Sequence, residues 1–113
     1  MGVRLRKTPA LLAVLQVLLH VDRPYGLEVI ELTGLPSGTV YPLLARLESE
    51  GWVTSHWETG DPGARGPRKR FYEITVDGAE RARAALADHV RATSRTGVAS
   101  RVRRQGLANQ EGR

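Results

Sequence analysis

Two short helical patterns meet at a turn containing glycine and proline near the middle of this 113-residue chain. The first pattern covers residues 25–33 and is followed by Gly34, a residue type that commonly ends helices. Ser37 or Thr39 is expected to cap the second helix. Its apolar residues recur every three or four positions on one helical face: Val40, Leu43, Leu44 and Leu47. Two short helices joined by such a turn predict a helix-turn-helix.

Two stretches rich in β-branched and aromatic residues follow, residues 52–57 (WVTSHW) and 70–76 (RFYEITV). This composition is typical of strands, and the glycine- and proline-rich segment between them predicts a β-hairpin with a long loop. Strand alternation favours Tyr72 and Ile74 on the core side. A last helix is expected to begin with Asp77 as its cap. We therefore predict a mainly α chain with a small β-hairpin (α+β), a winged helix-turn-helix with an added C-terminal dimerisation helix.

Apolar residues between Pro9 and Val21 cover nearly every direction around a helix, which indicates burial on more than one side. A chain this short buries a small share of its surface alone, so we expect a second subunit to cover part of it. The predicted dimer interface consists of Leu11, Leu15, Leu18, Ala82, Leu86 and Val90. Residues 1–92 are expected to form one domain, in which about residues 77–92 are the dimerisation helix. Residues 93–113 are expected to be a disordered basic tail.

The net charge of +5 lies at the end of the chain. Residues 1–88 contain 11 basic and 11 acidic residues, whereas residues 89–113 contain 6 basic residues and 1 acidic residue. Because a basic tail can raise the isoelectric point of almost any domain, charge alone does not indicate a nucleic-acid partner. The absence of cysteine permits a reducing cytoplasm. The early apolar run contains Gln16 and is too short to span a membrane, so we expect a cytoplasmic location without membrane contact.

No arrangement typical of catalysis is present in the sequence. His20, His56 and His89 lie in three different predicted elements without the paired spacing of metal ligands. Glu48 and Glu50 are interpreted as solvating charges on an exposed helical face. There is no Ser/His/Asp arrangement, glycine-rich phosphate loop or pair of carboxylates in a predicted cleft. We therefore expect a protein that is not an enzyme and that needs no cofactor and no metal.

Two motifs in the middle of the chain are specific. Residues 38–51 read G-T-x-Y-P-x-L-x-R-L-E-x-x-G, and a strand resembling R-K-x-Y-Y follows at residues 68–72. Further matching residues are Tyr25, Gly26, Ile74, Thr75 and Gly78. This pattern resembles the PadR family of bacterial transcriptional regulators over about residues 10–92, in a short form with a single C-terminal helix. The resemblance implies a repressor that binds a palindromic operator as a homodimer and that a small effector can release.

The side of the second helix opposite its apolar stripe carries short, hydrogen-bonding side chains, which suit a helix that reads the major groove. The candidate DNA contacts on it are Ser37, Gly38, Thr39, Tyr41, Pro42 and Arg46. The hairpin adds basic residues that can reach phosphates: Arg65, Arg68, Lys69 and Arg70. Two alternatives stay open: that Tyr41 and Pro42 only pack and cap the helix, and that the basic cluster is a solvated loop.

Trp52 and Trp57 have opposite parity along the first strand, so both can face the core only if a bulge intervenes. One of them is a candidate contact for a small aromatic effector, because the resemblance implies ligand binding between subunits and an indole can stack on an aromatic ring. The alternative is that both tryptophans simply pack. An alternative function is a winged-helix protein–protein interaction module without sequence-specific DNA binding, since this fold is used both for DNA binding and for protein binding. The basic hairpin favours DNA.

Overall fold

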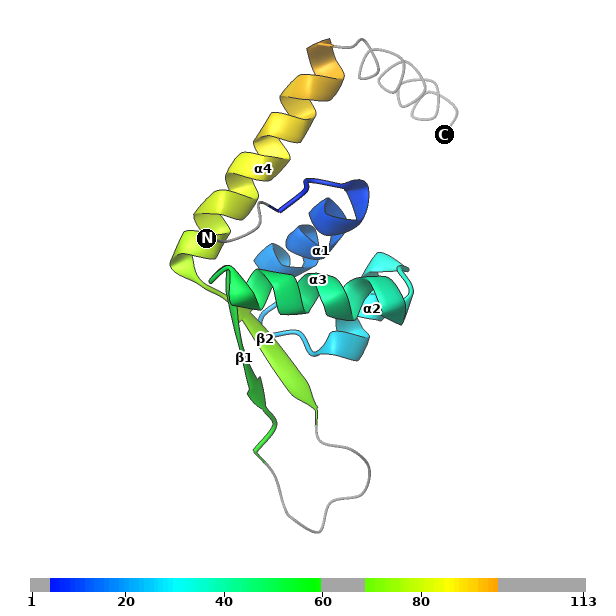
Figure 1. Ribbon diagram of the computed structural model, residues 1–113, viewed down its shortest axis with the longest axis vertical. Coiled ribbons are helices and arrows are strands. Elements are labelled where there is room, and N and C mark those ends of the chain that lie inside the picture. The colour runs from blue at the N-terminus through cyan, green and yellow to red at the C-terminus, as the bar shows by residue number, and fades with distance from the viewer. Residues whose placement is uncertain (1–4, 60–68, 96–113) are drawn as a thin grey trace, which may run out of the picture. The chain divides into compact units, whose positions relative to one another are not determined.

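The computed structural model describes residues 5–59 and 69–95 (Figure 1). Its elements are, in order, α1 (Pro9–His20), α2 (Gly26–Thr33), α3 (Ser37–Ser49), β1 (Val53–Trp57), β2 (Arg70–Ile74) and α4 (Val76–Arg95). The two antiparallel strands form a hairpin after α3, which confirms the predicted mainly α winged helix-turn-helix. The chain divides into two compact units, and α4 runs from the first, which ends at Ala82, into the second, which starts at Arg83.

The start of α1 is fixed by its first residues. Thr8 Oγ1 accepts a hydrogen bond from the backbone N–H of Leu11 at 3.1 Å, and Pro9 occupies the first helical position, where its missing N–H costs little. α1 contacts α2, α3 and β2, so several of its sides are covered. The buried apolar side chains of the first unit are Leu11, Leu12, Val14, Leu15, Leu18, Val29, Val40, Leu44, Leu47, Trp52, Val53, Tyr72 and Ala82.

This packing corrects part of the predicted dimer interface. Leu11, Leu15, Leu18 and Ala82 are each at most 3% exposed within the single chain, so they offer no surface to a second subunit. The apolar character of α1 on nearly every side is explained by the several elements of its own chain that pack on it. The other two predicted interface residues lie in α4, where Leu86 is half-buried and Val90 is 61% exposed.

The helix-turn-helix consists of α2 and α3. α2 ends at Gly34, whose φ of 74° lies in the left-handed region that glycine adopts without a steric penalty. α3 begins at Ser37 with Pro36 as its N-cap, and no side chain caps it. The predicted cap by Ser37 or Thr39 is therefore wrong, because both residues lie inside the first turn of the helix and not at the position that precedes it.

The hairpin register pairs Val53 with Ile74 at one end and Trp57 with Arg70 at the other. Directly paired residues share a face of the sheet. One face consists of Val53, Ser55, Trp57, Arg70, Tyr72 and Ile74, and the opposite face of Thr54, His56, Phe71 and Glu73. Tyr72 is buried as predicted, whereas Ile74 is half-buried.

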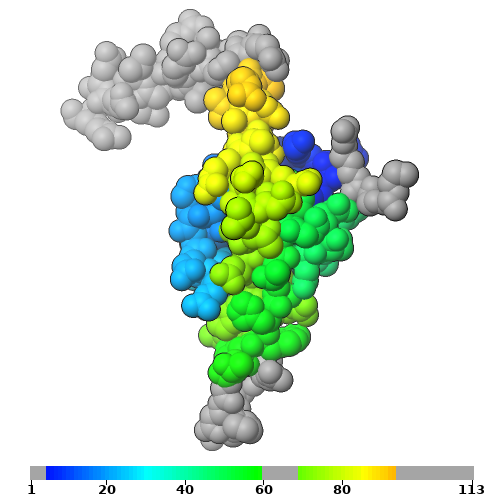
Figure 2. All heavy atoms as spheres, turned by 90° about the vertical axis from the view of Figure 1, so that its left-hand side faces the viewer, coloured from blue at the N-terminus to red at the C-terminus, as the bar shows by residue number. Residues whose placement is uncertain are grey.

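One backbone hydrogen bond joins β2 to the loop after α1, and a second closes the base of the hairpin. The N–H of Tyr72 donates to the carbonyl of Pro24 at 2.9 Å, and the N–H of Thr75 donates to the carbonyl of Trp52 at 2.8 Å. In Figure 2 the green hairpin residues lie between the light-blue residues around the end of α1 and the blue-green residues of α3. The hairpin is thus attached at its base on both sides.

The start of α4 differs from the prediction. Thr75 Oγ1 accepts a hydrogen bond from the backbone N–H of Gly78 at 2.8 Å, so Thr75 rather than Asp77 caps the helix. Asp77 instead forms an ion pair with Arg81 at 2.9 Å. A β-carbon on Gly78 would overlap the carbonyl oxygen of Trp52, so only glycine allows this close approach. Within the described residues, no helix is long and apolar enough to cross a membrane.

Candidate nucleic-acid interface

One side of α3 is buried and the other is open to solvent. Val40, Leu44 and Leu47 form the buried side. The predicted contact residues lie on the open side or at its edge, since Ser37, Gly38, Tyr41, Pro42 and Arg46 are exposed and Thr39 is half-buried. The spacing of the exposed residues places them on one continuous stripe along the helix. α3 therefore presents one continuous exposed stripe, which includes hydrogen-bonding side chains, to solvent.

Tyr41 combines packing with exposure. A β-carbon on Gly26 of α2 would lie 2.5 Å from Cε1 and 3.1 Å from the hydroxyl oxygen of Tyr41, so the ring rests against that glycine. The side chain is nevertheless 46% exposed. One part of the Tyr41 ring therefore packs against α2. The remaining part is open to solvent, so packing is not the only role that its position allows.

A groove of about 410 Å³ runs beside the first half of α3. It is lined by residues of α3, among them Gly38, Thr39 and Pro42, and by residues before and at the start of α1. Arg6 from the segment before α1 and Arg46 from α3 both line the groove, and both are exposed. Arg6 was not predicted as a site residue, because it is far in the sequence from the helix-turn-helix and the hairpin.

The basic cluster of the hairpin is described in part. Arg65 and Arg68 lie outside the described residues, whereas Lys69 and Arg70 lie within them. Lys69 Nζ stands 4.4 Å from the centre of the Tyr25 ring, an arrangement in which the cation is attracted to the face of the ring. That ring also contacts Phe71 edge to face, with ring centres 5.9 Å apart. Lys69 is thus held on the side of the hairpin that faces α2.

Arg70 is engaged on the opposite side of the hairpin. Its Nε and Nη2 donate hydrogen bonds to Ser55 Oγ at 3.0 and 2.7 Å, and Nη2 lies 3.4 Å from Glu48 Oε1. The Ser55 hydroxyl in turn donates to Glu48 Oε2 at 2.6 Å. The interpretation of Glu48 as a solvating charge is therefore wrong, because this carboxylate links α3 to both strands. The guanidinium carbon of Arg70 also stands 5.2 Å from the centre of the Trp57 ring.

The buried phenol of Tyr72 lies in the same electrostatic environment. Burial raises its pKa above the ordinary value of 10.0 because the charged form loses hydration. The positive charge of Arg70 opposes this rise, and Glu48 and Tyr41 add to it. The phenol is therefore neutral at neutral pH, and it contributes an apolar body to the interior of the first unit.

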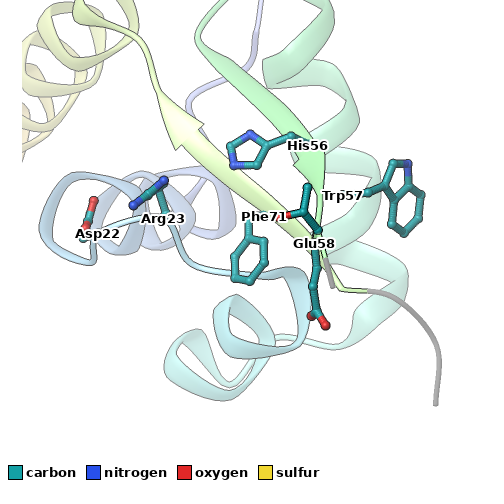
Figure 3. Close-up of a pocket in the computed structure, with 7 residues that line it drawn as sticks. Asp22, Arg23, His56, Trp57, Glu58 and Phe71 are labelled. Atoms are coloured by element: carbon teal, nitrogen blue, oxygen red, sulfur yellow. The ribbon is translucent and has the colours of Figure 1, made fainter. Parts of the chain in front are cut away.

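A second pocket lies on the other face of the hairpin, and both charged and aromatic residues line it. Figure 3 shows His56 and Phe71 on the side of the strands that faces the loop after α1, where Asp22 and Arg23 lie, and Trp57 pointing away from them. The rings of His56 and Phe71 stack at 6.2 Å. Arg23 has a φ of 45°, a left-handed backbone conformation that few residues other than glycine adopt.

The two tryptophans have different environments. Trp52 is 6% exposed and belongs to the core, so it cannot contact an effector in an open cleft. Trp57 is 49% exposed, so the alternative that both tryptophans pack in the core is correct for Trp52 only. Within residues 5–59 and 69–95, no group of three or more His, Asp and Glu side chains is placed to hold a metal ion.

Residues 14–84 match the sequence model of the PadR-like family of transcriptional regulators. A PadR-like transcription factor from Bacteroides fragilis has a similar structure, with a TM-score of 0.67 and 22% identity over 81% of this chain and 90% of that chain. PadR of Bacillus subtilis, solved with operator DNA, has a TM-score of 0.57 and 19% identity over 67% of this chain and 46% of that chain.

BpsR of Bordetella bronchiseptica, whose DNA binding is regulated by 6-hydroxynicotinic acid, has a TM-score of 0.65 and 23% identity. The alignment covers 94% of this chain and 80% of that chain. No curated protein matches this chain significantly in sequence. At these identities the structural similarities show a shared winged-helix fold.

Proposed function

Because the chain belongs to the PadR-like family of transcriptional regulators, we propose that it binds double-stranded DNA as a homodimer and represses transcription from a palindromic operator. The observation that carries this proposal is the exposed polar stripe of α3, which lies beside a hairpin with basic residues. α3 would enter the major groove and the hairpin would contact the phosphate backbone. In a dimer the two copies of α3 would stand about 34 Å apart, one turn of the double helix.

The stripe supports this function through its chemistry. Ser37 and Gly38 stand at the N-terminus of α3, where free backbone N–H groups and the helix dipole favour a phosphate. Arg46 lies further along the same stripe and is exposed, so its guanidinium can reach a phosphate or a base edge. The proposal includes a cytoplasmic location and no enzymatic activity, as expected for a regulator of transcription.

The proposal is tested with the DNA that adjoins the gene for this protein. Fluorescence anisotropy with this fragment and with random DNA of equal length is expected to show tighter binding to the fragment. Arg46→Ala is expected to weaken binding to the fragment about tenfold, equal to about 1.4 kcal/mol. Arg81→Ala, which removes the same charge from an exposed position on the side of α4 opposite Val90, is the matched control. Equal binding to both DNAs, or no binding, would contradict the proposal and favour a protein–protein interaction module.

We place the dimer contact on α4, through Leu86 and Val90. Val90 is 61% exposed although it is apolar, so its burial by a second copy would be favourable. Val90→Glu is expected to give a monomer in sedimentation velocity experiments. Ala84→Glu, at another exposed position of α4, is the control and is expected to leave the dimer intact. A dimer that survives Val90→Glu would place the interface elsewhere.

A small aromatic effector would release the DNA in this proposal. BpsR supports it as a regulator of similar fold that responds to an aromatic acid. In this chain the exposed ring of Trp57 is the contact we propose. Titration with 6-hydroxynicotinic acid is expected to quench the fluorescence of Trp57 and to release the operator. Quenching that persists in Trp57→Phe, which retains Trp52 alone, would contradict this contact.

A further inference from the structure

Three side chains from three elements meet between the recognition helix and the hairpin. Glu48 comes from α3, Ser55 from β1 and Arg70 from β2. Each one contacts the other two, through distances of 2.6 Å between Ser55 Oγ and Glu48 Oε2, 2.7 Å between Arg70 Nη2 and Ser55 Oγ, and 3.4 Å between Arg70 Nη2 and Glu48 Oε1. We call this set of three residues the α3–hairpin latch.

The hydrogen-bonding groups of the latch are well matched. The Ser55 hydroxyl has one proton to donate, which goes to Glu48, and it accepts both bonds from the Arg70 guanidinium. The Arg70 and Glu48 side chains are 40% and 35% exposed, so water competes only partly for these contacts. The Trp57 ring lies over the same guanidinium and limits its movement. The latch is therefore more than a pair of solvated surface charges.

The latch acts at the end of the hairpin far from its base. Backbone bonds to Pro24 and Trp52 hold the inner part of the hairpin, through Tyr72 and Thr75. Arg70 pairs with Trp57 at the outer end, next to the connecting loop. A two-stranded hairpin has little stability of its own, so its outer end needs side-chain contacts to keep one direction. On one face, Lys69 and Phe71 contact the Tyr25 ring at the start of α2. On the other face, the hydrogen bonds of the latch connect this end to α3.

We propose that Glu48, Ser55 and Arg70 are positioning residues that hold the hairpin at the distance and angle from α3 at which both can contact one DNA duplex. This inference rests on the proposed DNA-binding function. It gives Arg70 a different role from the direct phosphate contact that the sequence predicts. Glu48 becomes necessary for DNA binding although its negative charge, considered alone, repels DNA.

The charge of Glu48 would weaken DNA binding, whereas its contacts in the latch would strengthen it. Because these two effects have opposite signs, removal of the side chain tests which one dominates. If Glu48 acts only through its charge, Glu48→Ala strengthens DNA binding, because it removes repulsion of the phosphates and frees Arg70. If the latch positions the hairpin, Glu48→Ala weakens operator binding, and we expect a loss of about tenfold. Glu50→Ala is the matched control, because it removes the same charge from the end of the same helix. It is expected to bind the operator at least as tightly as the wild type.

Two further variants separate position from charge. Ser55→Ala changes no charge and is expected to weaken operator binding severalfold. Arg70→Lys keeps the positive charge but cannot bond Ser55 and Glu48 through a planar fork, so it is expected to behave like Glu48→Ala. If Arg70 were a simple phosphate contact, lysine would replace it with little loss. If circular dichroism shows that Glu48→Ala does not fold, these two variants still test the proposal.

Hydrogen exchange provides a readout that does not depend on DNA. In the free protein, the backbone amides of His56 and Glu58 are expected to exchange faster in Glu48→Ala than in Glu50→Ala, because they point across the hairpin and that of Glu58 donates to the carbonyl of Lys69. Glu48→Ala that binds the operator as tightly as Glu50→Ala, or unchanged exchange, overturns the positioning role while the DNA-binding function stands. Wild-type protein that does not bind the fragment overturns the proposed function, and the positioning role with it.

Discussion

The ring of Tyr41 in α3 rests on Gly26, the first residue of α2, so closely that a β-carbon at position 26 would come within 2.5 Å of Cε1. Gly26 is buried, whereas Tyr41 is 46% exposed. The bare α-carbon is what leaves room for the ring at this point. Tyr41 therefore packs against α2 and also contributes to the outer surface of the helix-turn-helix.

Gly26→Ala is expected to lower the free energy of unfolding by about 1–3 kcal/mol, because the added methyl group must displace the Tyr41 ring or separate the helices. Urea unfolding followed by circular dichroism measures this loss. The same substitution in a Tyr41→Ala background isolates the cause, since the ring is then absent. A loss of equal size in both backgrounds would show that the ring is not responsible.

Gly38→Ala is expected to separate stability from DNA binding. Gly38 is the second residue of α3, and no atom lies within 4 Å of a β-carbon added there. Alanine is a better helix former, so the free energy of unfolding is expected to rise by up to about 1 kcal/mol. On the proposed DNA-facing surface, the same methyl group is expected to hinder the approach of the backbone to phosphate. Undiminished operator affinity would remove Gly38 from the interface.

Tyr72 is expected to make the fold sensitive to alkaline pH. Its raised pKa means that the folded state keeps the phenol proton above pH 10.0, where the unfolded state loses it. This contribution to stability is therefore complete below about pH 10 and is lost as the pH rises through the folded-state pKa. Urea unfolding at a series of pH values from about 9 to 11 measures the decline. Tyr72→Phe should flatten it, and Tyr25→Phe is the control.

Arg6 is expected to contact phosphate, since it lines the groove beside α3 together with Arg46. Arg6→Ala should weaken binding to operator and random DNA by similar factors, because phosphates carry no base sequence. The slope of log affinity against log salt concentration should fall in magnitude by about 0.9 for one lost phosphate contact. Arg81→Ala is again the matched control. A loss confined to the operator would instead indicate that Arg6 reads bases.

The sequence predicted those features that depend on local periodicity. The stripe of α3 follows from a spacing of three and four residues: Val40, Leu44 and Leu47 are buried as predicted, whereas Leu43 is half-buried. The inward Tyr72 follows from strand alternation. The dimer contacts on α1 were wrong for a physical reason. An all-round apolar helix shows that several surfaces cover it, and the sequence does not show whether these belong to one chain or two.

The latch could not be predicted because it joins residues far apart in the chain. Glu48 and Arg70 are 22 positions apart, and their contact depends on the hairpin register and on the direction in which the strands leave α3. In the sequence, Glu48 and Glu50 are equivalent acidic residues near a helix end. The cap of α4 is a similar case, since Thr75 and Asp77 are both good capping residues and the start of the helix decided between them.

Pro42 removes one backbone hydrogen bond from α3. It lies inside α3 and lacks the N–H that would bond to the carbonyl of Gly38 four residues earlier. The opening turn is thus joined to the remainder by one bond fewer than a regular helix would have, while Leu44 and Leu47 anchor the later turns in the interior. Because Val40 is fully buried and anchors the opening turn as well, the missing bond does not create a hinge, and its consequence is a Gly38 carbonyl that lacks its usual partner on the exposed side of α3.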